Sequence, residues 1–196
     1  MFTAVSIVHS ISGLRPAVQR AGSNSRVRRN PTLLPVVVVL AALILACLCP
    51  GAYALSPADL RADQNLTPER LMKYVSGFKF EQRRELRSTE TFLRERCGDC
   101  DDFAVMAAGV LREKGYRTRL VAVYMAREVH VVCYVAESGG YLDYNRRKEA
   151  DPVVKCPETL AAIGARVAES FRTDWLSVSE YSLTGGRAEF LQTEFR

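Results

Sequence analysis

The sequence predicts an α+β domain in which an amphipathic helix packs on an antiparallel sheet. Apolar residues recur at helical spacing between Cys100 and Gly115. Three strand-like runs follow, at residues 120–125, 129–135 and 141–144. A second helical pattern and two further strand runs close the chain. Because helices are followed by consecutive strands, without alternation of strand and helix, the α+β class is favoured.

Residues 1–54 have the order of a secretory signal. An arginine cluster at 26–29 precedes an apolar run at 33–49, and Ala-Tyr-Ala at 52–54 follows as a small-x-small cleavage site. We therefore expect a signal peptide over residues 1–54 and a protein that is periplasmic or secreted. The alternative is an uncleaved membrane anchor, which is disfavoured because Pro35 interrupts a run already at the short limit for spanning.

The positive charge of the chain comes from that segment. The full chain carries a net charge of +5, and residues 1–54 hold five arginines and no acidic residue. Residues 55–196 therefore hold 22 basic and 22 acidic side chains. No basic footprint for nucleic acid is left, so we expect no nucleic-acid partner. These 142 residues are enough for one domain with its own core.

Two helices are expected before Cys97. Residues 55–65 have the composition of a loose leader. Thr67-Pro68 then predicts a helix start, with threonine as N-cap and proline at the first helical position. A short strand is expected at 78–80, and Ser88 is expected to cap a second helix that leads the chain to Cys97.

Glycine and proline mark the later boundaries. Gly115 is expected to end the helix that begins at Cys100. Gly139-Gly140 predicts a tight turn between the second and third strands, and Gly185-Gly186 predicts the turn of a closing hairpin. A helix is expected from Pro157 to Phe171, and its apolar stripe should pack on the sheet away from any functional site.

Cys100 stands where a nucleophile would be expected, at the start of a helix and on its buried side. Free N–H groups and the positive end of the helix dipole should favour the thiolate, which is the form that attacks carbonyls. Such a nucleophile needs a base and an orienting group. His130, the sole histidine of residues 55–196, opens the second strand, and Asp143 lies on the next strand. This order is typical of thiol enzymes with a Cys-His-Asp arrangement.

The predicted turn places one condition on this triad. A two-residue turn at Gly139-Gly140 would pair Ala136 with Asp143 and would leave His130 about 20 Å away along the sheet. A bulge, a wider turn or a different pairing is therefore required. Asn145, on the same face as Asp143, is the reserve for the third position.

The segment Gly-Asp-Cys-Asp-Asp-Phe-Ala at 98–104, followed by His130 and Asp143, resembles the transglutaminase-like superfamily. Within it, the match is to the bacterial transglutaminase-like cysteine proteinases, and it is strongest over residues 88–145. The resemblance implies a papain-like fold, a Cys100–His130–Asp143 triad and a protein or peptide substrate. It also implies a thioester intermediate, resolved by water in hydrolysis or by an amine in glutamine acyl transfer. We favour hydrolysis.

The resemblance also raises the question of calcium, which some of these proteinases bind through acidic residues beside the nucleophile. Asp99 and Asp101 match those positions, with Asp101 in place of the more usual glutamate. Calcium prefers six to eight oxygen ligands. Acidic residues at a helix start also compensate the helix dipole. We favour the second role and expect no required cofactor.

Three other interpretations of the cysteines stay open. Cys97 and Cys100 form a C-x-x-C, as in thiol–disulfide oxidoreductases, although no apolar strand leads into it. Cys97, Cys100, His130 and Cys133 have zinc-ligand spacing, although residues 130 and 133 of a strand point to opposite faces. A disulfide from Cys97 to Cys133 or Cys156 would leave Cys100 a spectator in a non-catalytic binding module.

Overall fold

A computed structural model describes residues 54–196. The predicted signal peptide lies, except for its last residue, outside the described residues. Among the helices of residues 54–196, none has the length and apolar character needed to cross a membrane.

The described helices and strands alternate irregularly along the chain. The α-helices are α2 (Pro57–Ala62), α3 (Pro68–Val75), α4 (Thr89–Glu95), α5 (Cys100–Glu113) and α6 (Leu160–Ser170). The strands are β1 (Lys79–Phe80), β2 (Cys97–Gly98), β3 (Thr118–Met125), β4 (Val129–Val135), β5 (Gly140–Leu142), β6 (Val153–Lys155), β7 (Trp175–Thr184) and β8 (Arg187–Phe195). Two short 3₁₀ helices complete the list, η1 (Ala136–Ser138) and η2 (Tyr144–Arg146).

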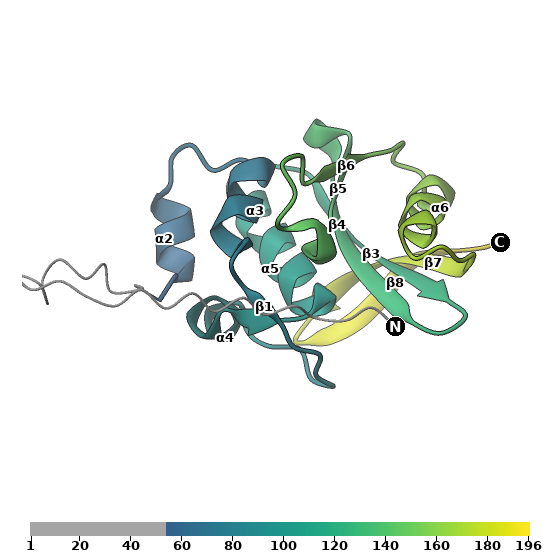
Figure 1. The fold of residues 1–196 in the computed structure, drawn as a ribbon, viewed down its shortest axis with the longest axis horizontal. Helices are drawn as coiled ribbons and strands as arrows, with labels where there is room; N and C mark the ends of the chain where they lie inside the picture. Colours follow the sequence, from purple (N-terminus) through teal and green to yellow (C-terminus); the bar gives the residue numbers. More distant parts are fainter. Residues whose placement is uncertain (1–53) are drawn as a thin grey trace, which may run out of the picture. The chain divides into compact units, whose positions relative to one another are not determined.

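A six-stranded sheet separates two helical layers (Figure 1). Its strand order is β6-β5-β4-β3-β7-β8, and every neighbouring pair is antiparallel. Helix α5 packs on β3 and β4, whereas α6 packs on β3 and β7 from the opposite face. The short strands β1 and β2 pair in parallel and bring the chain to the start of α5. The predicted α+β fold, with a helix on an antiparallel sheet, is confirmed.

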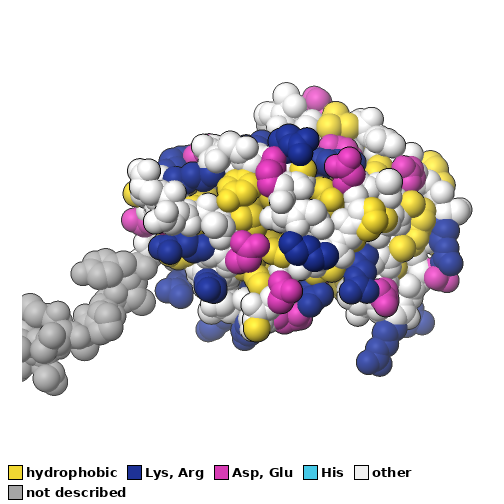
Figure 2. All heavy atoms as spheres, turned by 90° about the horizontal axis from the view of Figure 1, so that it is seen from above, with side chains coloured by type: hydrophobic (Ala, Val, Ile, Leu, Met, Phe, Trp, Pro, Cys, Tyr) yellow, Lys and Arg dark blue, Asp and Glu magenta, His cyan; other side chains and the backbone are white. Residues whose placement is uncertain are grey.

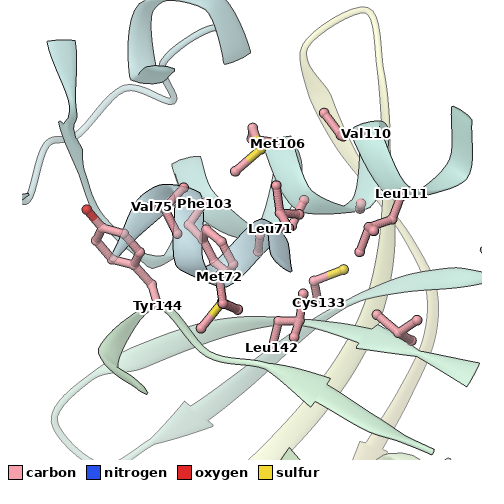
Figure 3. Close-up of a cluster of buried hydrophobic side chains, with 14 of the residues drawn as sticks. Leu71, Met72, Val75, Phe103, Met106, Val110, Leu111, Cys133, Leu142 and Tyr144 are labelled. Atoms are coloured by element: carbon pink, nitrogen blue, oxygen red, sulfur yellow. The ribbon is translucent and has the colours of Figure 1, made fainter. Parts of the chain in front are cut away.

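The two faces of the sheet bury separate hydrophobic cores because the side chains of a strand alternate. In β4, Val131, Cys133 and Val135 belong to the core under α5, whereas Val132 and Tyr134 belong to the core under α6. Figure 3 shows the first core, in which side chains of α3 and α5 meet the sheet residues Cys133 and Leu142.

Most predicted helix starts coincide with the observed ones, because a side chain caps each of them. Thr67 accepts from the N–H of Arg70 at the start of α3, and Ser88 accepts from the N–H of Thr91 at the start of α4. Gly115 follows the end of α5 with φ +90°, a left-handed conformation that glycine adopts without strain.

Two local predictions were wrong, and one strand was not predicted. The expected leader contains α2, which begins with a capping box between Ser56 and Asp59. Helix α6 begins at Leu160, after Pro157, because Thr159 supplies its N-cap. The strand β6 was not predicted, since three residues are too short for a recognisable alternation.

The tight turn at Gly139-Gly140 was also wrong, and its correction changes the geometry of the site. The connection from β4 to β5 runs through η1 and Gly139, and Gly140 already pairs with Val135. Cys133 pairs with Leu142, so Asp143 lies near Val132 in register, two residues from His130 instead of six.

The charged residues of the described domain are mixed in sign. Figure 2 shows lysine and arginine side chains interspersed with aspartate and glutamate over the face in view, with apolar side chains between them. This distribution agrees with the balanced count of basic and acidic residues in 55–196.

Candidate active site

Helix α5 begins at Cys100 because Asp99 caps it. The Asp99 carboxylate accepts hydrogen bonds from the N–H groups of Asp101 and Asp102, at 3.2 and 3.3 Å. The Asp102 carboxylate in turn accepts from the N–H of Asp99, at 3.3 Å, which completes a capping box. Cys100 is therefore the first helical residue, and its own N–H has no partner within the helix.

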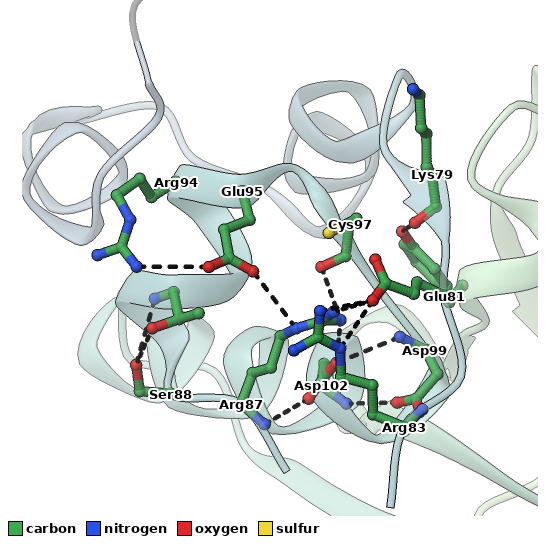
Figure 4. A network of polar contacts seen from close by, with 12 residues as sticks. Lys79, Glu81, Arg83, Arg87, Ser88, Arg94, Glu95, Cys97, Asp99 and Asp102 are labelled. Carbon is green, nitrogen blue, oxygen red and sulfur yellow. Dashed lines mark hydrogen bonds and ion pairs between the residues drawn. The ribbon is translucent and has the colours of Figure 1, made fainter. Parts of the chain in front are cut away.

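A buried arginine holds the preceding loop against this helix start (Figure 4). The Arg87 N–H donates to Asp102 Oδ1 at 2.7 Å, and Arg87 Nη1 donates to Asp102 Oδ2 at 3.1 Å and to the Cys97 carbonyl at 3.0 Å. Arg87 Nη2 lies 3.0 Å from a Glu81 oxygen, as an ion pair whose angle is too poor for a hydrogen bond. No local pattern in the sequence indicated this role for Arg87.

Gly98 is required by the same close packing. A Cβ atom at this position would lie 2.6 Å from both Asp102 Oδ2 and the ring of Phe92. A side chain at position 98 would therefore displace either the capping carboxylate or a core aromatic ring.

His130 and Asp143 form a buried pair at the ends of β4 and β5. His130 Nε2 lies 2.9 Å from Asp143 Oδ1. The same carboxylate oxygen accepts the N–H of Asn145 at 2.8 Å, which fixes its position. Because Nε2 faces the carboxylate, Nδ1 is the ring nitrogen left to exchange a proton with another group. The partner of His130 is thus Asp143, and the reserve residue Asn145 contributes its backbone to Asp143.

Cys100 and His130 line one open cavity of about 430 Å³. Phe80, Gln82, Arg83, Asp99, Asp101, Arg127, Glu128, Val129, Asn145 and Phe171 complete its lining. The Cys100 side chain donates to Asp101 Oδ1 at 3.4 Å and accepts a hydrogen bond from the Val131 backbone. The cavity therefore combines a thiol, an imidazole held by a carboxylate and a helix N-terminus.

The thiolate predicted for Cys100 is not the resting form in this structure. Partial burial raises the pKa of the Cys100 thiol to about 12, and the nearby charges of Asp101 and Asp99 act in the same direction. The hydrogen bond from Val131 opposes this shift without reversing it. The prediction counted the helix dipole and omitted the burial of the sulfur, which is the largest cause of the raised pKa.

We predict that Asp101→Asn makes Cys100 more reactive. The substitution removes a negative charge beside the thiol, so the thiol pKa falls and the thiolate fraction rises at any pH below that pKa. Alkylation of Cys100 by iodoacetamide at pH 8, located by peptide mass spectrometry, should be several-fold faster than in the unmodified protein. In the latter, the rate should still be rising at pH 10.

Glu128→Gln is the matched control, because Glu128 lines the same cavity and makes no hydrogen bond to the thiol. Equal alkylation rates in Asp101→Asn and Glu128→Gln would contradict the role assigned to the Asp101 charge.

The other predicted roles of the cysteines have little support in residues 54–196. Cys97, Cys100, Cys133 and Cys156 are all free thiols. Cys97 lines a different cavity from Cys100, together with Glu81 and Glu95. Burial, with a hydrogen bond to Glu81, raises the pKa of the Cys97 thiol, which disfavours a redox-active pair with Cys100. His130 and Cys133 point to opposite faces of the sheet. They therefore cannot bind one zinc ion together, as the zinc alternative requires.

Asp99 and Asp101, the two residues considered as possible calcium ligands, both hydrogen-bond to neighbouring groups. Asp99 is occupied by three backbone N–H groups, those of Asp101, Asp102 and Arg83. The Asp101 carboxylate accepts a hydrogen bond from the Cys100 thiol. Within the described part of the chain, no three His, Cys, Asp or Glu side chains are grouped to hold a metal ion. We therefore assign no step to calcium.

The helix α6 contributes to the site, contrary to the prediction. Leu160, Ile163 and Val167 are buried against the sheet, as expected. Phe171, which caps the helix, lies over the His130 ring with centroids 5.0 Å apart and lines the cavity. Phe171 also packs against the core under α6, so it contacts both that core and His130.

Comparison with known proteins places this geometry in a family. The family model for the transglutaminase-like superfamily matches residues 62–156, which include Cys100, His130 and Asp143. Residues 62–156 belong to the transglutaminase-like superfamily. No curated protein matches the chain.

A solved structure from Cytophaga hutchinsonii is also similar to the chain that carries this transglutaminase-like domain. It is described as a candidate cysteine protease, and it shares 17% sequence identity with a TM-score of 0.36. The match covers 82% of the present chain and 57% of the Cytophaga protein. The chain thus spans little more than half the length of that protein.

Proposed function

We propose that the transglutaminase-like domain is a thiol hydrolase that cleaves amide bonds of proteins or peptides through Cys100. The observation that carries this proposal is the buried His130–Asp143 pair, 2.9 Å apart, at the cavity into which Cys100 opens. Asp143 holds the imidazole through Nε2, and Nδ1 can then act as a base toward the thiol.

The first half-reaction forms a thioester. His130 Nδ1 takes the proton from the Cys100 thiol while the Cys100 sulfur bonds to the carbonyl carbon of the substrate. The π electrons of that carbonyl move to its oxygen. The N–H of Cys100, free at the start of α5, is the donor that we assign to this oxyanion. The C–N bond then breaks, and His130 returns the proton to the leaving nitrogen.

The second half-reaction releases the acid. His130 accepts a proton from water as the water oxygen attacks the thioester carbonyl, and the C–S bond breaks. The proton returns to sulfur, which restores the neutral thiol. Because burial raises the pKa of the Cys100 thiol, the sulfur needs a base to lose its proton, and we assign this role to His130. We also propose that the protein acts after export, as its signal-like N-terminal segment suggests.

Trapping the thioester tests this function. The purified protein is incubated with a mixed peptide library, and the reaction is quenched in acid. The protein is then digested, and the mass of the fragment containing Cys100 is measured by mass spectrometry. We expect an acyl adduct on Cys100 that hydroxylamine removes, together with cleaved peptides. An added primary amine that is incorporated into the product would point to acyl transfer instead of hydrolysis. An adduct on Cys97, or no adduct and no cleavage, would overturn the proposal.

A further inference from the structure

A second cavity adjoins the one that contains Cys100. It has a volume of about 280 Å³ and lies on the α5 side of the sheet, under the β7–β8 hairpin. Six of its lining residues are Val105, Tyr124, Val129, Tyr181, Leu183 and Phe190. We call this cavity the hairpin groove. It shares Asp101 and Val129 with the Cys100 cavity, so the two cavities adjoin at these residues.

The hairpin groove is apolar, and among residues 54–196 Asp101 is the one charged side chain that lines it. Two apolar side chains that line the groove are exposed to solvent, since Phe190 is 60% exposed and Val129 is 50% exposed. The Tyr181 ring is buried, and this burial, with the charge of Asp101, raises the pKa of its phenol. Tyr181 therefore stays neutral, and the groove offers apolar surface with a single negative charge at its neck.

The position of the groove relative to Cys100 limits what it can hold. Asp101 follows Cys100 in the chain and accepts a hydrogen bond from its thiol. The neck of the groove therefore lies beside the reacting sulfur. Consecutive residues of an extended peptide are about 3.8 Å apart. A peptide whose carbonyl is at Cys100 Sγ would therefore place a residue close to the bond under attack at the mouth of the groove.

We propose that the hairpin groove is the specificity subsite of this enzyme and takes an uncharged aliphatic or aromatic side chain of the substrate, within two residues of the bond that is cleaved. This inference rests on the proposed function and names its substrate class. A volume of about 280 Å³ accommodates one large side chain and excludes a folded segment. The Asp101 carboxylate at the neck disfavours an acidic side chain there, because like charges repel.

A positional peptide series tests the substrate class. Peptides differ at one position at a time, over the two residues on each side of the scissile bond, with Leu, Phe, Ser or Asp at the varied position. At one position we expect kcat/KM for Leu or Phe to exceed that for Ser at least about tenfold, in the range that apolar pockets achieve, with Asp the poorest. Equal rates at all four positions would overturn the subsite while leaving the proposed function intact.

Two variants of β8 locate the subsite. Phe190→Ser removes a wall of the groove, and Leu191→Ser is its matched control, because Leu191 is 61% exposed and does not line the groove. Leu191 is the extra residue of the β7–β8 bulge, next to Phe190, which pairs with Tyr181. We expect Phe190→Ser to raise KM for the Phe peptide about tenfold and to remove the preference over Ser, and Leu191→Ser to change neither. Similar effects of the two variants would overturn the assignment.

A binding measurement separates this inference from the proposed function. N-acetyl-phenylalanine amide and N-acetyl-serine amide are titrated into the full chain, and binding is followed by NMR line shifts. The phenylalanine amide should bind more tightly to the unmodified protein than to Phe190→Ser, even if no peptide is turned over. Equal binding of the two amides, or equal binding to the two proteins, would overturn the subsite.

Discussion

Replacement of Cys100 by alanine should abolish peptide turnover, and replacement of His130 by alanine should lower kcat at least about 10³-fold. Residues that act as one catalytic unit lose nearly the whole effect when either is removed. Loss of His130 should lower kcat for a further reason, since the Cys100 thiol is neutral at rest and needs a base to reach its reactive form. Turnover of the preferred peptide, measured with thermal unfolding of each variant, checks both expectations.

Cys97→Ala is the control for these variants. Cys97 is a second free thiol three residues away, and it lines a different cavity. Its removal should leave turnover largely intact under the proposed mechanism. A Cys97→Ala protein that folds and loses activity together with Cys100→Ala would rule out the triad and would support the redox alternative, which needs both sulfurs.

The second large effect should appear in stability and should come from the pair Arg87 and Asp102. Both side chains are buried, and their charged atoms are 3.1 Å apart. Arg87→Leu alone leaves the Asp102 carboxylate buried without its cation, and removal of one partner of such a pair costs about 3–5 kcal/mol. We expect the free energy of unfolding, measured in urea, to fall by this amount.

Arg61→Leu provides the comparison, because Arg61 pairs with Glu113 at the surface, where ion pairs contribute about 0–1 kcal/mol. The double variant Arg87→Leu with Asp102→Leu should recover part of the loss, since no buried charge then lacks a partner. If Arg87→Leu were no more harmful than Arg61→Leu, the buried pair would have no special role at the helix start.

The sequence could predict those parts of the fold that depend on local signals. Helices α3 and α4 each have the predicted capping side chain, α5 begins at Cys100 as predicted, and Gly115 ends α5 where a left-handed residue is needed. The edge strand β6 could not be predicted, because its three residues gain their structure from pairing with β5. Long-range pairing of this kind has no local pattern.

The candidate site shows the same division. Cys100 and His130 could be placed from helix and strand periodicity, whereas the distance to Asp143 depended on the width of the β4–β5 turn. The buried role of Arg87 had one available signal. Asp102 lies four residues before Met106 on the buried face of the helix, and a buried carboxylate requires a partner. The sequence offered several arginines nearby, and no local rule distinguishes among them.

The two hydrophobic cores give the nucleophile and the base separate supports. Cys100 packs against the core under α5, whereas the ring of His130 packs against Phe171 at the end of α6. Changes within one core can thus shift one reactive group while the other keeps its place. Under the proposed function, substitutions around the end of α6 would therefore act first on the His130 ring and on proton transfer.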